Sequence, residues 1–302
     1  MMRIGVDFGG TKIEAAALDA EGRFQARVRA PNPGGYDEAL QAVCDLVDEA
    51  ERQAGDCKRV GVGAPGSISP LNGVIRNANS TWLNGRAFGR DLERVLERPV
   101  RLANDANCLA LSEAADGAAA GAGVVFAAIL GTGCGGGVVV DGRPINGRNG
   151  VAGEWGHVPL PWPTGAEVDP PECWCGRRGC LETYISGSGL ARDHDAVTGQ
   201  RLTAEAIVAA AKVGDAAAAA ALDRYVDRLG RGLAVAVDLL DPDVIVLGGG
   251  LSNAQVLYDR LPSVIGRWIF SDVFETPVVK ALHGDSSGVR GAAWLWPLDA
   301  DR

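Results

Sequence analysis

Apolar residues gather in short runs that end in glycine or proline. Four runs have the length and composition of buried strands: residues 3–8 (RIGVDF), 59–64 (RVGVGA), 100–103 (VRLA) and 124–130 (VVFAAIL). A glycine turn and a second extended segment follow the first run, at 12–18, and the last run, at 138–140. Because this strand, turn and strand pattern occurs twice, it predicts a duplicated βββαβα architecture.

Apolar spacing of three and four residues predicts helices between these strands. We expect helices at residues 37–54, after Asn104, over the alanine-rich stretch 204–240 and at 288–298. With a further strand at 243–247, the order of elements predicts an α/β fold. A chain of 302 residues suits two lobes. We place them at 1–115, completed by a C-terminal helix over 288–302, and at 116–287, with an irregular insert at 153–182.

Charge and hydropathy exclude several classes of protein. The formal net charge is −9, which disfavours binding to nucleic acid or to anionic membranes. No run approaches the roughly 18 apolar residues of a membrane span. Asp7 also comes too early for the apolar part of a signal peptide. We therefore expect a cytoplasmic protein that binds neither nucleic acid nor membranes.

Three glycine-rich turns follow predicted strands. In the first, at residues 7–12 (DFGGTK), the glycine pair exposes backbone N–H groups, Thr11 and Lys12 add donors, and Asp7 can hold Mg²⁺ through water. A plain hairpin turn is the alternative interpretation. The other two turns are GTGCGGG at 131–137 and GGG at 248–250. We predict that the three turns converge on one nucleotide cleft between the lobes.

A carboxylate suited to general-base chemistry follows the strand at 100–103. Asn104 and Asp105 lie where α/β sheets bind ligands, beyond the carboxyl end of a strand. Phosphoryl transfer needs a carboxylate that orients the attacking hydroxyl and accepts its proton. The alternative is that one of the two residues only caps the next helix.

The insert carries a group of metal-ligating residues. The seven cysteines of the chain include Cys173, Cys175 and Cys180, and His157 precedes them. One imidazole and three thiolates satisfy a tetrahedral structural zinc site. A Cys173–Cys180 disulfide or free thiols are the alternatives. Glu154 and Glu182 flank this group and could accept hydrogen bonds from a polyol, although solvated glutamates are the ordinary interpretation.

Together these motifs resemble the ROK family of sugar kinases, within the superfold of actin and hexokinase. The similarity spans nearly the whole chain through VDFGGTK, GVGAPGS, ANDAN, GTGCGGG, GEWGH, CWCGRRGCLE, DPDVIVLGGG and DSSGVRGAAW, in the family's order. It implies a two-lobe actin/hexokinase-like ATPase fold. It also implies an ATP-dependent hexose kinase with Mg²⁺, a structural Zn²⁺ and the catalytic base Asp105.

The resemblance implies a role for each matching position. It implies sugar contacts by Gly66, Asn79, Asn104, Asp105, Glu154, His157 and Glu182. It implies ATP contacts by Gly5, Asp7, Gly9, Gly10, Thr11, Lys12, Gly131, Thr132, Gly133, Gly135, Gly248, Gly249 and Gly250. The implied zinc ligands are His157, Cys173, Cys175 and Cys180, and a homodimer is the family habit.

Within the family, three segments resemble fructokinases: NANSTWLNG at 77–85, GHVPLPWP at 156–163 and HGDSSGVRGAAWLWP at 283–297. They favour fructose, and secondly mannose, as the sugar that is phosphorylated on O6. N-acetylglucosamine kinases share nearly all of the same motifs and are the alternative.

Proteins of other classes share this fold. A repressor needs a DNA-binding helix-turn-helix ahead of the first strand, which here begins at residue 3. An actin-like or chaperone-like ATPase has no zinc knuckle. A non-catalytic sugar-binding regulator is the remaining alternative, and the presence of Asp105 argues against it.

Overall fold

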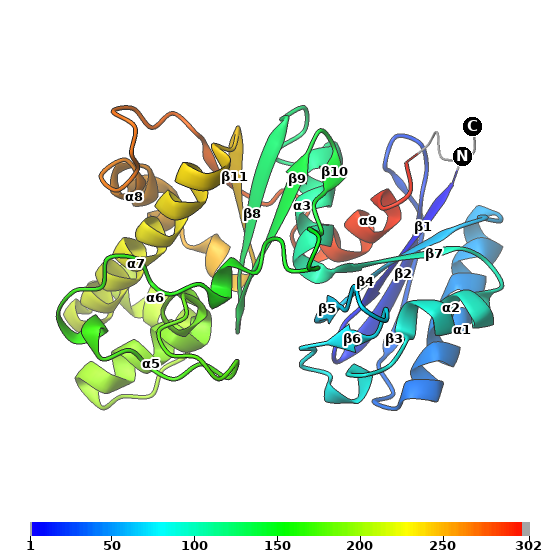
Figure 1. Cartoon of the computed structure of the whole chain (residues 1–302), viewed down its shortest axis with the longest axis horizontal. Coiled ribbons are helices and arrows are strands. Elements are labelled where there is room, and N and C mark those ends of the chain that lie inside the picture. The colour runs from blue at the N-terminus through cyan, green and yellow to red at the C-terminus, as the bar shows by residue number, and fades with distance from the viewer. Residues whose placement is uncertain (1, 298–302) are drawn as a thin grey trace. The chain divides into compact units, whose positions relative to one another are not determined.

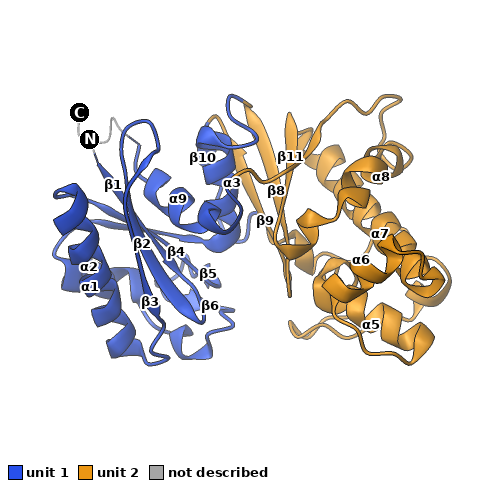
Figure 2. Cartoon of the chain, turned by 180° about the vertical axis from the view of Figure 1, so that it is seen from behind, with its two compact units in different colours: residues 1–121, 142–152, 283–302 blue, residues 122–141, 153–282 orange. Residues whose placement is uncertain are grey.

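The computed structural model of the chain describes residues 2–297. The chain divides into two compact units, shown in Figure 2. Within the described residues, unit 1 consists of 2–121, 142–152 and 283–297, and unit 2 of 122–141 and 153–282. This division differs from the predicted boundaries at 115 and 288, because residues 116–121, 142–152 and 283–287 also join unit 1. Residues 298–302 of the predicted C-terminal helix lie outside the described residues.

Unit 1 is built on a mixed sheet with strand order β3-β2-β1-β4-β7. Its strands are β1 (Arg3–Phe8), β2 (Lys12–Leu18), β3 (Phe24–Pro31), β4 (Val60–Ala64) and β7 (Val100–Asn104). The hairpin of β5 (Ser67–Ile68) and β6 (Ile75–Arg76) and the short strand β10 (Arg143–Pro144) complete its strands. Its helices are α1 (Tyr36–Ala54), η1 (Thr81–Leu83), α2 (Phe88–Leu96), α3 (Asp105–Asp116), η5 (Gly284–Ser286) and α9 (Ser287–Trp294).

Unit 2 repeats the central part of this arrangement, with strand order β9-β8-β11-β12. Its strands are β8 (Val124–Leu130), β9 (Cys134–Val140), β11 (Val244–Gly248) and β12 (Val278–Lys280). Its α-helices are α4 (Glu182–Ile185), α5 (Gly187–Thr198), α6 (Ala204–Lys212), α7 (Ala216–Leu240) and α8 (Gln255–Ile265), labelled in Figure 1 where there is room. The 3₁₀ helices are η2 (Trp155–His157), η3 (Gly165–Val168) and η4 (Gly250–Asn253).

The two sheets have equivalent centres. β1 pairs antiparallel with β2 and parallel with β4, and β8 pairs antiparallel with β9 and parallel with β11. In each unit the turn that joins the antiparallel pair is glycine-rich. The predicted duplicated α/β architecture is therefore confirmed.

Two of the differences from the sequence-based prediction have a clear physical cause. The alanine-rich stretch is two helices, because the chain turns at Gly214 and the Asp215 side chain caps α7 by accepting a hydrogen bond from Ala218 N at 2.8 Å. The strand β3 was missed. Many of its residues are exposed, and arginines alternate with small apolar residues along it, so it lacks the apolar run of a buried strand.

The C-terminal segment completes unit 1 by packing on its first strand. Gly5, in the middle of β1, lies so close to α9 that an added Cβ would be 2.1 Å from Val289 O. The buried Glu113 of α3 accepts hydrogen bonds from Ser287 Oγ at 3.0 Å and His283 N at 3.1 Å. Helix α9 is thus fixed between β1 and α3, beside the strand end that carries Asp7.

Candidate functional site

The turn after β1 is held open by a residue that the motif does not include. Asn32, which follows β3, donates from its side chain to Gly9 O at 2.8 Å and from its backbone to Thr11 O at 2.9 Å. Gly10, Thr11 and Lys12 are exposed, so their donors can reach a ligand. Asp7 is half-buried at the end of β1.

Asp7 has an unusual ionisation. Burial raises its pKa to about 6, and the negative charges of Asp105 and Glu14 act in the same direction, against the smaller effect of Lys12. A neighbouring cation would stabilise the ionised form of this carboxylate. This electrostatic environment fits the predicted contact with Mg²⁺ through water.

Asn104 and Asp105 join β7 to α3. Asn104 caps the helix, since its Oδ1 accepts from Ala106 N at 2.8 Å, while its amide donates to Gly66 O at 2.9 Å. The structure therefore brings together three predicted sugar contacts, Gly66, Asn104 and Asp105. The capping alternative is correct for Asn104 and leaves the role of Asp105 open.

The Asp105 carboxyl is open to solvent, although protein atoms crowd around it. One oxygen accepts from Ala106 N at 2.8 Å. The surrounding protein raises the pKa of Asp105 by desolvation, partly offset by hydrogen bonds from the backbone and Asn104. A raised pKa makes a carboxylate a better proton acceptor.

Asn79 lies on an exposed loop between β6 and η1. Asn84 fixes this loop by exchanging two hydrogen bonds with the backbone of Ala78, at 2.9 and 3.1 Å. Among residues 2–297, the hydrogen bond that the Asn79 side chain accepts is a local one from Ser80 N. Its amide is therefore available to a ligand.

In unit 2, the glycine turn after β8 is tied to the first turn of α5. Gly131 O accepts from Gly187 N at 2.7 Å, and Thr132 O accepts from Ser188 Oγ at 2.9 Å. A hollow of about 360 Å³ lies here and is also lined by residues at the start of α6 and by Gly250. The N-termini of two helices border it, and such helix ends favour anions.

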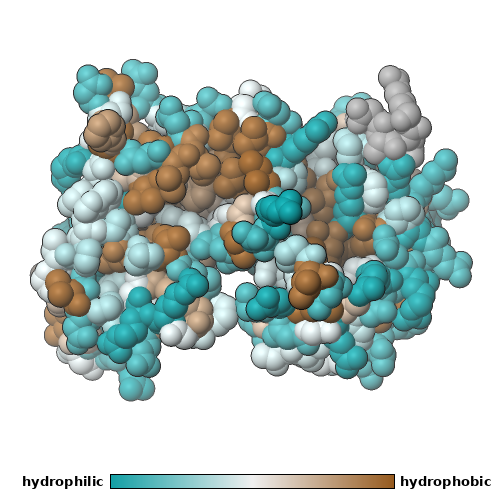
Figure 3. All heavy atoms as spheres, in the orientation of Figure 1, coloured by the Kyte–Doolittle hydropathy of each residue, from teal (hydrophilic) through white to brown (hydrophobic). Residues whose placement is uncertain are grey.

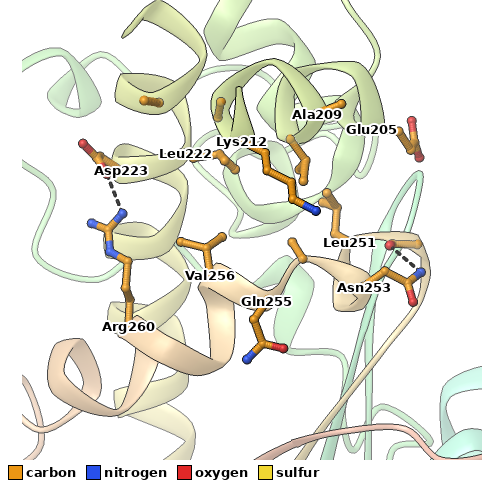
Figure 4. A pocket seen from close by; sticks show the side chains of 15 residues that line it. Glu205, Ala209, Lys212, Leu222, Asp223, Leu251, Asn253, Gln255, Val256 and Arg260 are labelled. Atoms are coloured by element: carbon orange, nitrogen blue, oxygen red, sulfur yellow. Dashed lines mark hydrogen bonds and ion pairs between the residues drawn. The ribbon is translucent and has the colours of Figure 1, made fainter. Parts of the chain in front are cut away.

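A larger cavity of about 640 Å³ adjoins this hollow and shares Glu205, Gly250 and Leu251 with it. Figure 4 shows Lys212 and Leu251 beside each other, with Asn253 and Gln255 along the same wall. At another part of the cavity, Arg260 pairs with Asp223 at 2.5 Å. The volume and mainly apolar lining suit a planar organic group with a few polar contacts.

The four predicted metal ligands come together. The ligand atoms of His157, Cys173, Cys175 and Cys180 all lie within 4.8 Å of one another. His157 Nδ1 is 3.7 Å from Cys173 Sγ, and Cys175 Sγ is 3.6 Å from Cys180 Sγ. Ligand atoms of tetrahedral zinc, at bonds of about 2.0–2.3 Å, are separated by about 3.4–3.8 Å. The donor set and spacing therefore fit zinc.

His157 reaches the cysteines because two segments run side by side. A β-bridge joins Pro159 to Cys180, and Leu181 N donates to Val158 O at 2.8 Å. Since Nδ1 faces Cys173, the other ring nitrogen, Nε2, remains for a different partner. This orientation fits the predicted double role of His157 as a metal ligand and a sugar contact.

The two flanking glutamates differ in their contacts. Glu154 is exposed and lies before η2. Glu182 is half-buried at the start of α4. Its Oε2 accepts from Cys134 N at 2.9 Å and its Oε1 from Trp174 Nε1 at 2.6 Å. Glu182 therefore joins the cysteine cluster to the glycine turn of the same unit.

Buried ion pairs hold the insert on α7. The Arg231 guanidinium donates to both oxygens of Glu167, at 2.8 and 2.9 Å, and to the backbone oxygens of Pro161 and Trp162. Arg228 joins Glu167 to Asp193 of α5. Burial alone would raise the pKa of Glu167, but the hydrogen bonds from Arg231 and Arg228 lower it to about 2.

Several predicted ATP contacts lie away from the turns. Gly5 is inside β1, where the packing of α9 explains the glycine. Gly135 is inside β9, and its carbonyl accepts from Trp155 Nε1 at 2.9 Å. Gly248 ends β11, Gly249 follows it, and Gly250 lines the cavity.

Sequence reasoning missed several residues that line the cavity or fix the turns. These are Asn32, Asn84, Glu205, Lys212, Asn253 and Gln255. Glu205 and Lys212 lie in an alanine-rich helix whose pattern gives no sign of a ligand. Asn32 follows β3, which was itself missed, so no sequence pattern pointed to it.

The surface is mixed in character. In Figure 3 the largest group of hydrophobic residues lies on unit 2. No helix among residues 2–297 is long and apolar enough to cross a membrane.

Comparisons with known proteins agree with this geometry. A model of the ROK family matches residues 3–298. A curated N-acetyl-D-glucosamine kinase of Pectobacterium atrosepticum is 41% identical over 303 residues, which cover 99% of this chain and all of that one. A ROK hexokinase of Thermus thermophilus is 34% identical with a TM-score of 0.89, covering 100% and 99% of the two chains.

A third relative was solved with its ligands bound. A ROK family glucokinase of Streptomyces griseus, solved with glucose and AMPPNP, is 30% identical with a TM-score of 0.79, covering 97% of this chain and 98% of its own. These neighbours confirm the predicted two-lobe actin/hexokinase-like fold. The predicted closeness to fructokinases is not supported, because the curated relative carries a different name.

The ion pairs of Glu167 make a prediction for stability. Glu167→Gln removes the charge that two buried arginines face and should lower the free energy of unfolding by about 3 kcal/mol at neutral pH. The pKa of Glu167 is lowered from 4.5 to about 2 on folding, so its contribution is present above pH 4.5 and is lost as the pH falls toward 2. The gap between wild type and variant in urea unfolding should therefore narrow over this range.

The matched control is Asp169→Asn, which breaks an exposed pair with Arg178 and should change stability by less than about 0.5 kcal/mol. Equal stability of wild type and Glu167→Gln at neutral pH would contradict the prediction.

Proposed function

The chain belongs to the ROK family and is an ATP-dependent sugar kinase, and we propose that its sugar is N-acetyl-D-glucosamine. The observation that carries the choice of sugar is the 41% identity to a curated kinase of that name, over the full length of both chains. The three segments that favoured fructose lie in loops and at the C-terminus, and they do not outweigh a similarity of this extent.

We assign binding and activation of the sugar hydroxyl to Asp105. The carboxylate accepts the hydroxyl proton as that oxygen bonds to the γ-phosphorus and the bond to the β-phosphate oxygen breaks, releasing ADP. The raised pKa of Asp105 supports this role, and Asn104 fixes the start of the helix that carries it. Asn79 and Gly66 supply further hydrogen-bonding groups in the same unit.

Unit 2 offers a place for ATP. Adenine suits the cavity of about 640 Å³, and the phosphates suit the adjoining hollow at Gly131, Thr132 and the helix ends. In unit 1, the donors of Gly9–Lys12 would neutralise the transferred phosphoryl group. Mg²⁺ bound with ATP would screen the phosphate charge, and Asp7 is the residue we assign to hold it through water.

Zinc would be held by His157, Cys173, Cys175 and Cys180, and its role would be structural. When bound, it orders an insert that has few other regular elements. Glu154, Glu182 and the Nε2 of His157 are the groups that we assign to sugar hydroxyls in this unit. We also expect a cytoplasmic homodimer, which light scattering of the purified protein would test.

The first experiment is an ADP-release assay with Mg-ATP and a panel of fructose, mannose, glucose, N-acetylglucosamine and N-acetylmannosamine. We expect the highest kcat/KM with N-acetylglucosamine, by at least about tenfold, since one hydrogen bond to the acetamido group would account for this ratio. Stronger turnover of another sugar would overturn the assignment of N-acetylglucosamine as the substrate, but the protein would still be a sugar kinase. ADP release that does not depend on any sugar would overturn both.

Asp105→Asn tests the general base. The variant should bind sugar and ATP normally but lose more than about 100-fold in kcat, as expected for a positioned base. In the wild type, kcat should fall in acid as the carboxylate is protonated, at a pH above the ordinary aspartate pKa of 3.8, because desolvation by the surrounding protein atoms raises the pKa of Asp105. Asp48→Asn, on the exposed face of α1, should keep full activity. Retention of kcat within about tenfold in Asp105→Asn would refute the assignment.

Metal analysis tests the zinc site. Purified protein should contain one zinc per chain, and Cys175→Ser should lose most of it and unfold at a lower temperature. Cys44→Ser changes a lone cysteine of α1 and should keep the metal. A wild type free of zinc after purification from zinc-containing medium would rule the site out.

A further inference from the structure

An exposed tryptophan lies between two of the predicted metal ligands. Trp174 separates Cys173 from Cys175, and 65% of its surface is exposed. Leaving so large an aromatic residue in water forgoes the stabilisation of burial. The zinc site does not need this residue, because its ligands are the flanking side chains. The position therefore calls for another explanation.

Two contacts fix the orientation of the Trp174 indole. Its Nε1–H donates to Glu182 Oε1 at 2.6 Å. Its ring meets that of His157 edge to face, with centroids 4.9 Å apart and planes at 83°. Both partners are residues that we assign to the sugar. An indole held in this way restricts the rotation of both side chains.

The second oxygen of Glu182 has an equally defined partner. Oε2 accepts from Cys134 N, at the start of β9. It lies so close to the preceding turn that a Cβ on Gly133 would be 2.8 Å away. Each carboxylate oxygen can accept two hydrogen bonds, so both retain a site for a sugar hydroxyl. Glu182 is thus held from two sides and still able to bind.

We propose that Trp174 is a positioning residue of the sugar site, whose indole N–H and ring hold Glu182 and His157 in the geometry that binds sugar hydroxyls. This inference rests on the proposed function, because it takes those two residues as sugar contacts. Trp174 is carried by the backbone of the cysteine cluster. A well-ordered cysteine cluster therefore holds Trp174 in place, and through Trp174 it affects the affinity for the sugar.

Trp174→Phe is the informative variant, because it keeps an aromatic ring and removes the N–H donor together with the five-membered ring that carries it. It should raise the KM and the equilibrium Kd for the sugar about tenfold, the effect of one hydrogen bond to a charged group. The kcat and the KM for ATP should change less than twofold. Zinc content and melting temperature should equal those of wild type. Trp174→Ala, which also removes the ring, should weaken sugar binding further.

A double-mutant cycle separates positioning from direct contact. If Trp174 acts through Glu182, Trp174→Phe should have little effect on sugar Kd in a Glu182→Gln background. The control is Trp162→Phe, since Trp162 is a second exposed tryptophan of unit 2 and stacks on Trp268 instead. It should leave sugar binding unchanged.

Each other outcome overturns the inference. A sugar Kd within twofold of wild type in Trp174→Phe would show that the N–H is not needed. Loss of zinc or of thermal stability would make Trp174 a structural residue of the cluster. Additive effects in the cycle would mean that it acts independently of Glu182. If the wild-type protein phosphorylates a sugar, any of these results overturns only the role of Trp174, and the proposed kinase function stands. If the wild-type protein shows no sugar-dependent turnover, both the role of Trp174 and the proposed function are wrong.

Discussion

Close approach to a glycine places a functional carboxylate in each unit. In unit 1, a Cβ on Gly288 would lie 2.7 Å from Asp7 Oδ2, and in unit 2, a Cβ on Gly133 would lie 2.8 Å from Glu182 Oε2. At these distances any larger residue would push the carboxylate away. The absence of a side chain at Gly288 and Gly133 thus leaves room for the carboxylates of Asp7 and Glu182.

The same constraint explains why the C-terminal segment belongs to unit 1. Helix α9 carries Gly288 and packs on β1, so residues at opposite ends of the chain share one wall of the Asp7 environment. The desolvation that raises the pKa of Asp7 to about 6 depends on this packing. The raised pKa of Asp7 therefore requires that helix α9 packs on β1.

Sequence patterns predicted the features whose cause is local. Apolar runs next to a glycine turn located β1, β2 and β8, and the spacing of Cys173, Cys175 and Cys180 identified the metal cluster. In each of these cases the chemistry lies within a few neighbouring residues. The pattern failed for β3, where exposure leaves no apolar run.

Features that depend on distant contacts could not be predicted. Glu182 appeared in the sequence as one of two acidic residues near cysteines, yet its partners Cys134 and Trp174 come from separate segments. The lining of the large cavity is drawn from α6, α7, η4 and α8, whose sequences are mostly alanine and other aliphatic residues. The identity of the sugar could not be predicted either, because a single hydrogen bond can change the preference for one sugar over another by orders of magnitude.

The irregular insert shows how a segment without a core of its own can still be rigid. Between η2 and α4 it contains one short 3₁₀ helix and two isolated β-bridges, so backbone pairing contributes little. Buried ion pairs stabilise the insert instead. Glu167 accepts hydrogen bonds from both Arg228 and Arg231, and Arg231 also donates to two backbone oxygens of the insert. Such a network is costly to break, because each remaining partner would be a buried, unpaired charge. It anchors one part of the insert on α7. At the other end, Trp174 donates to Glu182, which in turn accepts from Cys134 N beside the glycine turn, so the two ends are fixed by separate contacts.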